Sequence, residues 1–304
     1  MHALSIKGKV GFTNAYLFRP DTLELPKVEN MPEERQSRLN AKTAKEASPA
    51  GTRPEPAPGV ATQNAVVVVP TFNERTNIAR LVDTLFGLYP NIHVLVVDDH
   101  SPDGTSEVVR GLQQDRDNLM LLERTHNPGF AASYRDGFRQ ALASPWCQVV
   151  ITMDADFSHD PSEIRHLLGR LAGHDVVVGS RYIAGGSVQR WNLRRRLLSL
   201  TANLYVRAAL SLPIHDTTSG FLCMRREALE GVPVQKTFSE GYVFLVELKC
   251  LLNRSGCKIV EHPIVFDERR EGQSKMSIGK VWESFWMPWR IRATIRERRS
   301  PAEA

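Results

Sequence analysis

The chain has 304 residues, which is long enough to bury a large hydrophobic core in one domain or two. Its apolar content of 42% and charged content of 24% are those of an ordinary globular protein, and no apolar run reaches the roughly 18 residues that a membrane span needs. The net charge of +5 is unevenly placed, with arginines crowded into 190–207 and 290–299, which favours anionic partners such as phosphates or lipid head groups.

The compartment and the class of partner follow from further features of the sequence. Four cysteines show none of the CxxC spacing that is typical of metal or redox sites, and no signal peptide is recognisable. We therefore expect a cytoplasmic protein with reduced thiols. No nucleic-acid-binding motif accompanies the basic residues, so nucleic acid is not an expected partner.

Residues 1–64 are expected to form a poorly ordered tail and linker. The stretch 29–64 is charged, rich in proline and alanine, and almost without large apolar residues. Such a segment cannot bury enough apolar surface to offset the entropy that is lost on ordering. The pattern changes at Ala65, where we place the start of a folded domain over 65–277. A separate C-terminal helix is expected in 278–304.

From Ala65 onward, short β-branched runs alternate with stretches whose apolar residues recur at helical spacing. Strands are predicted at 66–69, 92–97, 119–123, 149–152 and 176–179. Helices are predicted at 76–89, 105–114, 131–143 and 161–171. This alternation predicts an α/β fold, in which βαβ units build a mostly parallel sheet that helices cover on both faces.

Three of the predicted strands lead into residues that can do chemistry. The strand at 149–152 is followed by Asp154 and Asp156, the strand at 92–97 by two aspartates, and the strand at 66–69 by Pro70–Glu74. Ligands of an open α/β sheet collect beyond the carboxyl ends of its strands. A single carboxylate there is more often a helix cap or a turn former, but several at one edge would repel one another unless a cation were bound. A divalent ion on Asp154 and Asp156 would in turn hold a diphosphate.

An ordered set of motifs makes this prediction specific. VVVVPTFNE, VVDDHSPDGT, MDADFSHDP and VVGSRY resemble, in this order, the inverting family 2 glycosyltransferases of GT-A fold, the Rossmann-like fold of nucleotide-diphospho-sugar transferases. GGSVQRWNLRRRLLS, DTTSGFLCMRREAL, EGYVFLVELK and ERREGQSKMS narrow the resemblance to polyprenol-monophosphate mannosyltransferases of the dolichol-phosphate mannose synthase type. The resemblance runs from Val66 to Ser277. It implies inverting transfer of mannose from GDP-mannose to a polyprenol monophosphate, with Mg²⁺ or Mn²⁺ as the cofactor.

Motif by motif, the resemblance implies roles for individual residues. The donor nucleotide-sugar would be bound at several strand ends, by Pro70, Phe72, Glu74, Asp99, Asp154 and Gly220. The metal ligands would be Asp154 and Asp156, and the catalytic residues would be Asp156, Arg181, Arg269 and Lys275. The acceptor phosphate would be clamped by arginines, namely Arg181, Arg194, Arg195 and Arg269. Arginine suits this task because its planar fork binds oxyanions in a bidentate way.

The reaction that the resemblance implies needs little acid–base catalysis. A phosphate monoester is largely ionised at neutral pH, so no general base has to deprotonate the acceptor. Positioning and stabilisation of the departing GDP are required instead, and Lys275 would neutralise charge on it. Gly220 is expected to let the backbone approach the sugar. His159 is interpreted as a support of the metal motif, and Glu247 either as a ligand contact or as the buried partner of an arginine.

Two departures from the family pattern leave alternatives open. Relatives often carry a glutamine as a further metal ligand where this chain has Ser158. They also carry Lys-x-Gly-x-Gly-x-Ala-Tyr ahead of the helix that precedes the metal strand, where this chain reads NPGFAASY at 127–134. Because the donor loop differs, transfer of glucose from UDP-glucose, or of another hexose, stays an alternative. From a different class, the alternative is a sugar-nucleotide-binding module without catalysis.

A membrane-bound acceptor would have to be reached without a transmembrane helix. The helix expected over 278–299 repeats aromatic residues at helical spacing and ends in arginines; the aromatic residues are Trp282, Phe285, Trp286 and Trp289. Such a pattern is typical of a helix that lies in the membrane interface, although Pro288 is expected to kink or break it. A second candidate is the mostly apolar helix predicted at Leu193–Leu212. We therefore expect a peripheral protein on the cytoplasmic face, with the membrane surface as a partner.

Overall fold

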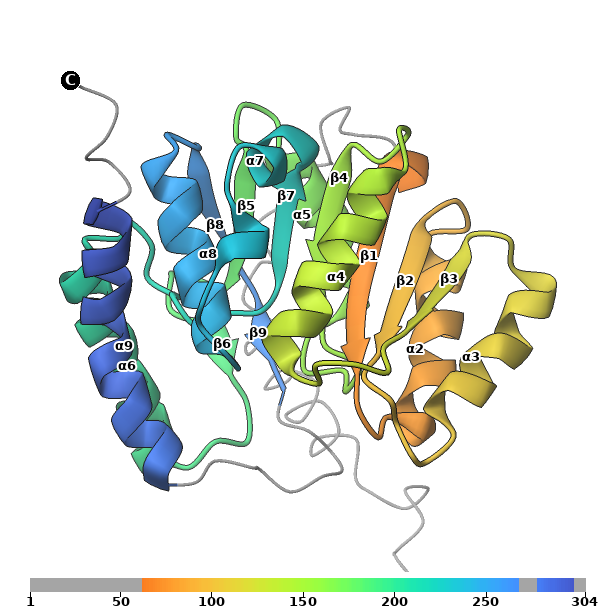
Figure 1. Ribbon diagram of the computed structural model, residues 1–304, viewed down its shortest axis with the longest axis horizontal. Coiled ribbons are helices and arrows are strands. Elements are labelled where there is room, and N and C mark those ends of the chain that lie inside the picture. Colours follow the sequence, from red (N-terminus) through yellow and green to blue (C-terminus); the bar gives the residue numbers. More distant parts are fainter. Residues whose placement is uncertain (1–61, 268–277, 298–304) are drawn as a thin grey trace, which may run out of the picture. The chain divides into compact units, whose positions relative to one another are not determined.

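The computed structural model describes residues 62–267 and 278–297. Its main sheet has seven strands in the order β3-β2-β1-β4-β7-β5-β8 (Figure 1). Their bounds are β1 Ala65–Thr71, β2 His93–Asp98, β3 Leu119–Glu123, β4 Val149–Thr152, β5 Val176–Ser180, β7 Leu222–Arg225 and β8 Ile259–Pro263. Two short strands, β6 Ser187–Val188 and β9 Val265–Phe266, form a second, parallel pair.

Eight α-helices cover the sheet or extend from it within the described ranges. They are α2 Arg75–Leu88, α3 Thr105–Leu112, α4 Phe130–Ala143, α5 Ile164–Arg170, α6 Leu193–Leu210, α7 Arg226–Glu230, α8 Val243–Arg254 and α9 Ile278–Glu297. Short 3-10 turns join some of them, at η2 Thr62–Asn64, η3 Gln113–Asp115, η4 Pro161–Glu163 and η5 Val234–Lys236.

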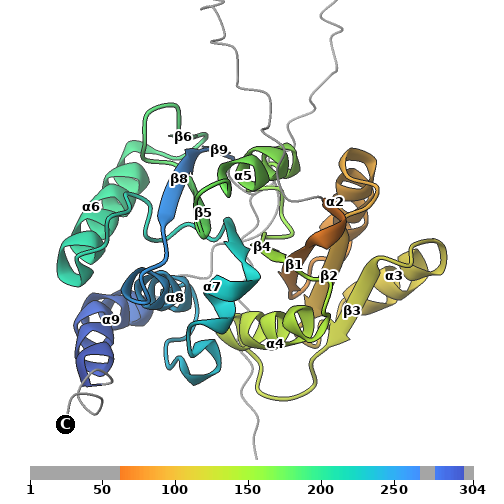
Figure 2. The same ribbon diagram turned by 90° about the horizontal axis from the view of Figure 1, so that it is seen from above.

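Alternate residues of the central strands enter two different cores. Val66 and Val68 of β1 pack in one core with α4 and α8, whereas Val67 and Val69 pack in the other with α2 and α5. Figure 2 shows these helix pairs on opposite faces of the sheet. Successive strand residues point to opposite faces, so a strand covered on both faces has to be apolar throughout. This is why the run Val66–Val69 reads as a strand without any polar alternation.

The predicted α/β architecture is confirmed, with one exception to the parallel order. β1, β2, β3 and β4 run parallel, as do β5 and β8. β7 lies between β4 and β5 and runs antiparallel to both. This strand was not among those predicted from the sequence. It brings the segment that precedes Leu222 to the edge of the sheet where β4 ends.

Pro288 was expected to kink or break the C-terminal helix, and it does not break it, because α9 is one helix from Ile278 to Glu297 with Pro288 inside it. Ile291 and Ile295 are buried in the same core as α8. A hydrogen bond from Arg292 Nη1 to the carbonyl of Ala209 joins α9 to α6 at 2.9 Å. The predictions for residues 1–61 and for 268–277 fall outside the described residues.

Candidate active site

The strand ends that the sequence singled out meet at one edge of the sheet. β1, β2, β4 and β5 end there at Thr71, Asp98, Thr152 and Ser180. Because β7 is antiparallel, its first residue lies at the same edge, and Leu222 pairs with Thr152. The segment 216–221 therefore lies beside the acidic motif that follows β4. The directions of the strands thus bring residues that are far apart in the sequence to the same edge of the sheet.

The acidic motif follows β4, whose four residues are all buried. Met153 and Ala155 are buried, while Asp154 and Asp156 are half-buried. The backbone N–H of Ser158 donates to Asp156 Oδ1 at 3.0 Å. Two carboxylates two residues apart supply the hard oxygen donors that divalent ions such as Mg²⁺ and Mn²⁺ prefer.

Ser158 adds an observation that fits a bound ion. Its hydroxyl oxygen is buried, and it has no hydrogen-bond partner among the described residues. A buried hydroxyl without a partner is costly in the absence of a ligand or water. The residues present at the motif thus fit a divalent cation, with water or Ser158 completing its coordination shell.

His159 holds the acidic motif in shape. Its ring is buried and stacked on Phe221, with 4.9 Å between ring centroids. The backbone N–H of Asp154 donates to its Nδ1 at 3.2 Å, so this nitrogen is an acceptor. Burial lowers the pKa of His159 to about 4, which keeps the ring neutral at physiological pH. These contacts support the interpretation of His159 as a structural support for Asp154.

Gly220 lies directly against the motif. Its carbonyl accepts a hydrogen bond of 2.5 Å from Thr152 Oγ1, and that hydroxyl in turn accepts the N–H of Leu222 at 3.1 Å. A Cβ at Gly220 would come within 3.5 Å of His159 Cε1 and 4.0 Å of Asp154 Oδ1. The Gly220 backbone therefore borders the space in front of Asp154.

Arg181 follows β5 and makes a buried ion pair with Asp216. Arg181 Nε and Nη2 donate to the two carboxylate oxygens at 2.7 Å, and the Arg181 backbone N–H donates to the same group at 3.0 Å. Burial opposes the charge on both groups, but the guanidinium holds the pKa of Asp216 below its ordinary value. Nη2 also donates to Thr218 at 2.8 Å, so Nη1 remains without a partner among the described residues.

Aromatic rings surround the Arg181 guanidinium and link it to Arg195. Its Cζ lies 5.2 Å from the Phe266 ring centroid and 5.8 Å from that of Trp191. Arg195 stacks on the same indole at 4.2 Å. The indole Nε1 of Trp191 is buried with no acceptor among the described residues. Two guanidinium groups and an indole N–H in this arrangement offer only donors, which suits an anion.

The other predicted acceptor residues lie apart or fall outside the described ranges. Arg194 is exposed in the first turn of α6. No described contact links it to Arg181. Arg269 and Lys275 lie in 268–277, outside the described residues.

At the end of β2, two neighbouring aspartates have different partners. Asp98 is buried and accepts from the hydroxyls of Thr71, Ser101 and Ser106 at 2.6–2.8 Å, so it holds the turn together. Asp99 is half-buried, pairs with Arg124 and accepts the N–H of Gly129 at 2.6 Å. It therefore fixes the loop that opens α4.

The remaining predicted donor residues follow β1. Pro70 lies in β1, Phe72 is 48% exposed, and Glu74 precedes α2, where its carboxylate accepts from the Asn77 amide at 2.8 Å. The Glu74 backbone N–H donates to Thr105 at 3.1 Å. These residues lie at the same edge as Asp99, whose N–H donates to the Thr71 carbonyl at 2.9 Å.

Lys249 and Glu247 lie on the buried helix α8, and the sequence singled out only Glu247. The Lys249 ammonium is fully buried and donates to the carbonyls of Thr217 and Ser219 at 2.9 and 2.7 Å. It therefore supports the loop that carries Gly220. Glu247 accepts the N–H of Ser239 at 2.9 Å, so its described partner is the backbone and not an arginine. The sequence did hold one indication of the role of Lys249, because a lysine inside an apolar helical run has to be buried together with hydrogen-bond partners.

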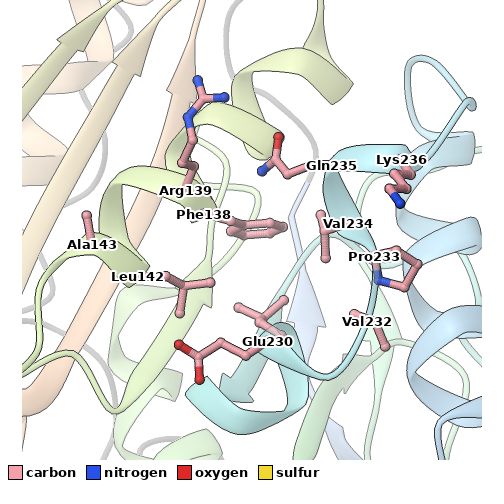
Figure 3. Close-up of a pocket in the computed structure, with 11 residues that line it drawn as sticks. Phe138, Arg139, Leu142, Ala143, Glu230, Val232, Pro233, Val234, Gln235 and Lys236 are labelled. Carbon is pink, nitrogen blue, oxygen red and sulfur yellow. The ribbon is translucent and has the colours of Figure 1, made fainter.

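A hollow of about 440 Å³ lies elsewhere, between the second half of α4 and the segment around η5 (Figure 3). Phe138 and Leu142 line it from α4, and Val234 lines it from η5. α4 leads from the end of β3 to the start of β4, so its second half lies toward the amino ends of the strands. None of the predicted site residues lines this hollow. We do not assign it to the site.

Comparisons with known proteins identify the family to which the sequence is similar. Residues 66–232 match the family described as glycosyl transferase family 2. The polyprenol monophosphomannose synthase of Mycolicibacterium smegmatis is 40% identical over 253 residues, which cover 82% of this chain and 95% of that protein. Within the described ranges, no helix is both long and apolar enough to cross a membrane.

Two solved structures share the fold at low sequence identity. A glucosyl-3-phosphoglycerate synthase from Mycobacterium tuberculosis, in complex with Mn²⁺, UDP and glucosyl-3-phosphoglycerate, superimposes with a TM-score of 0.53 at 19% identity and covers 77% of this chain and 79% of its own. A mannosyltransferase from Pyrobaculum calidifontis, in complex with GDP-Man and Mn²⁺, superimposes with a TM-score of 0.50 at 19% identity and covers 78% of this chain and 65% of its own.

Proposed function

The chain belongs to glycosyl transferase family 2, as a GT-A enzyme of the polyprenol-phosphate mannosyltransferase type, and we propose that it transfers mannose from GDP-mannose to a polyprenol monophosphate. One observation carries the proposal. A carboxylate pair, Asp154 and Asp156, lies at the same sheet edge as Arg181, which is near the Trp191 indole on which Arg195 stacks. The carboxylate pair with a bound metal suits a diphosphate donor, and the cationic groups around Arg181 suit a phosphate acceptor.

The donor half joins the ends of β1, β2 and β4. We assign the nucleotide to the space bordered by Pro70, Phe72, Glu74 and Asp99, and the sugar to the space between Asp154 and Gly220. The mannosyltransferase that shares the fold is in complex with GDP-Man and Mn²⁺, which supports this donor and this class of metal. Bound at Asp154 and Asp156, Mg²⁺ or Mn²⁺ would supply charge that stabilises the departing diphosphate.

The acceptor half is organised by Arg181. Asp216 takes its Nε and Nη2, which fixes the plane of the guanidinium and leaves Nη1 for an acceptor oxygen. Arg195, held against Trp191, adds a second positive charge on the same indole. An ionised phosphate held in this way is already the nucleophile, so the residues have to position it and exclude water rather than abstract a proton.

The surface of α6 supports peripheral attachment to the membrane. Its buried face holds the acceptor side, since Asn203 Oδ1 accepts the N–H of Thr217 at 2.8 Å. The outer face exposes a leucine stripe at helical spacing: Leu193, Leu197, Leu200 and Leu204. Leu193 is 81% exposed and Leu204 67%. A leucine face that opens with arginines is typical of a helix that enters the interfacial layer of an anionic membrane.

Only one side of α9 is exposed and can add to the proposed membrane-contacting surface. Trp286 and Trp289 are exposed, whereas Met287, Ile291 and Ile295 are buried. Deleting 278–304 would uncover this buried side, so point substitutions on the exposed leucines are the cleaner test of attachment. We propose that α6 is the principal membrane contact and that α9 contributes its two exposed indoles.

A donor panel tests the proposed function. Purified full-length protein with Mn²⁺ and a short polyprenol phosphate is offered GDP-mannose, UDP-glucose or UDP-galactose, and glycolipid is measured by mass spectrometry. Mannolipid from GDP-mannose, lost in Asp156→Asn, is expected. Glucolipid from UDP-glucose would reassign the donor and keep the mechanism. Nucleotide binding without any glycolipid would favour a non-catalytic module.

A further inference from the structure

A second cluster of ligand-type side chains is formed by the end of η4, the start of α5 and strand β8. Glu163 ends η4, His166 lies in the first turn of α5, and His262 lies on β8. Glu163 Oε2 is 3.0 Å from His166 Nδ1 and 3.0 Å from His262 Nε2. The three potential ligand atoms all lie within 4.8 Å of one another, and each of the three side chains is less than 15% exposed.

The two separations that involve Glu163 Oε2 are close to the spacing of a tetrahedral metal site, and the two histidine nitrogens lie within 4.8 Å of each other. With metal–ligand bonds of about 2.0–2.1 Å, neighbouring ligand atoms of a tetrahedral zinc site are about 3.3 Å apart. The observed 3.0 Å separations need to widen by only a few tenths of an ångström. His262 can make this movement because its other ring nitrogen, Nδ1, has no partner among the described residues.

The charge state of the cluster also suits a cation. Hydrogen bonding by His262, and then by His166, outweighs burial and lowers the pKa of Glu163, so the carboxylate is ionised at neutral pH. The two rings lie stacked, with 5.6 Å between centroids and 26° between planes, and direct both nitrogens at the same oxygen. The nitrogen of a neutral imidazole is the commonest metal ligand in proteins.

We propose that Glu163, His166 and His262 bind a transition-metal ion of the Zn²⁺ class, at a site separate from the carboxylate pair of Asp154 and Asp156. Two imidazoles and one carboxylate are the ligands of zinc sites that keep one position open. They discriminate against Mg²⁺, which prefers oxygen ligands and water. The inference does not depend on the identity of the donor sugar or of the acceptor.

A bound ion at this place would connect two parts of the active edge. Glu163 follows the acidic motif after one short turn, which Tyr89 fixes by hydrogen bonds of 3.1 Å to the Pro161 and Ser162 carbonyls. His262 pairs with Gly179 in the β5–β8 ladder, just ahead of Arg181. The ion would therefore join the segment that carries Asp156 to the strand beside Arg181, as a structural cross-link.

Zinc binding by the purified full chain, stripped of metal with a chelator, tests the proposal. Isothermal titration with Zn²⁺ alone is expected to show one tight site, and Co²⁺ alone is expected to give the visible absorption of a tetrahedral ion. His262→Gln and His166→Asn keep a donor near the Glu163 oxygen but remove a ligand. Each should weaken Zn²⁺ binding by at least the 10–100-fold that is typical when only an outer partner is lost.

Two controls separate this site from the acidic motif and from histidines in general. Asp156→Asn should retain the tight Zn²⁺ site, and so should His174→Asn, which changes a histidine outside the cluster. Zn²⁺ should raise the thermal midpoint of the wild type and of Asp156→Asn but not of His166→Asn. Equal Zn²⁺ affinity in wild type and both cluster variants, or loss of the site in Asp156→Asn, would overturn the proposal. Mannosyl transfer in Mg²⁺ is measured separately, so its failure is distinguishable from failure of zinc binding.

Discussion

Arg181 and Asp216 form a buried ion pair in which Nε and Nη2 of the guanidinium each donate to a carboxylate oxygen at 2.7 Å. Asp216 is fully buried, and Arg181 is 9% exposed. The pair lies in the acceptor half of the proposed site. It stabilises that half, and it fixes which guanidinium nitrogen is left to bind an acceptor.

Replacing Asp216 by asparagine should destabilise the protein strongly. The change leaves the Arg181 charge buried without its counter-charge, and breaking a buried pair costs on the order of 3 kcal/mol. Urea unfolding measures the loss. Asp83→Asn, which removes an exposed partner of Arg116, serves as the control and should change the free energy of unfolding little. Equal effects of the two substitutions would contradict the structural importance of the Arg181–Asp216 pair.

Gly220→Ala should leave the fold intact and impair donor binding. A Cβ there would have its nearest contact at 3.4 Å, to Leu245 Cδ1, which is ordinary van der Waals distance. Stability should therefore stay within about 1 kcal/mol of the wild type. The methyl group would occupy space in front of Asp154, so the KM for the sugar nucleotide should rise while the KM for the acceptor stays the same.

Gly87→Ala is the matched control for that substitution, because nothing lies within 4 Å of a Cβ at this exposed position of α2. Both KM values should match those of the wild type. An unchanged donor KM in Gly220→Ala would remove this residue from the donor site.

Lys249 should make stability depend on pH in a defined window. Burial lowers its pKa to about 7, whereas the ordinary value of 10.5 applies to the unfolded chain. Between these values the unfolded chain holds a proton that the folded chain has released, so the free energy of unfolding rises with pH. Lys249→Met removes this contribution.

The advantage of the wild type over Lys249→Met should therefore grow as pH rises from 7 to about 9, by at most about 1.4 kcal/mol per pH unit. Urea titrations at several pH values measure the difference. Lys258→Met, a change at an exposed lysine, should show no such trend. A difference that stays constant with pH would mean that Lys249 has the same pKa in the folded and unfolded chains.

The leucine stripe of α6 gives a test of membrane attachment. Leu197→Asn combined with Leu204→Asn should reduce co-sedimentation with anionic liposomes on the order of tenfold or more, since two exposed leucines lose their burial in the interface. Nucleotide affinity should be unchanged. Leu88→Asn, at an exposed leucine on α2, is the control, and binding of the double variant at the wild-type level would exclude α6 as the contact.

Much of the fold follows from local pattern, and the exceptions have tertiary causes. The strands at 119–123 and 149–152 have the predicted bounds because β-branched and apolar runs there are closed by turn residues. The antiparallel insertion of β7 was not predictable, since four residues at 222–225 carry no signal for strand direction. Without β7, no pattern places Gly220 beside Asp154.

The site was predictable in its residue types but not in its pairings. Asp98 and Asp99 are neighbours in an acidic pair, yet one is buried among hydroxyls and the other holds Arg124. The alternation of a strand separates them, and only the packed structure shows which side carries donors. Likewise, the sequence offered Arg181 as an anion ligand without showing that Asp216 already holds two of its nitrogens.

Acceptor choice tests the central claim most directly. Purified protein with GDP-mannose and Mn²⁺ is offered a polyprenol phosphate and 3-phosphoglycerate together, and both products are quantified by mass spectrometry. The structure predicts mannosyl phosphopolyprenol as the product, abolished by Asp156→Asn and strongly reduced by Arg181→Lys. Mannosylation of phosphoglycerate in preference to the lipid, or mannolipid formation that survives both substitutions, would contradict the account.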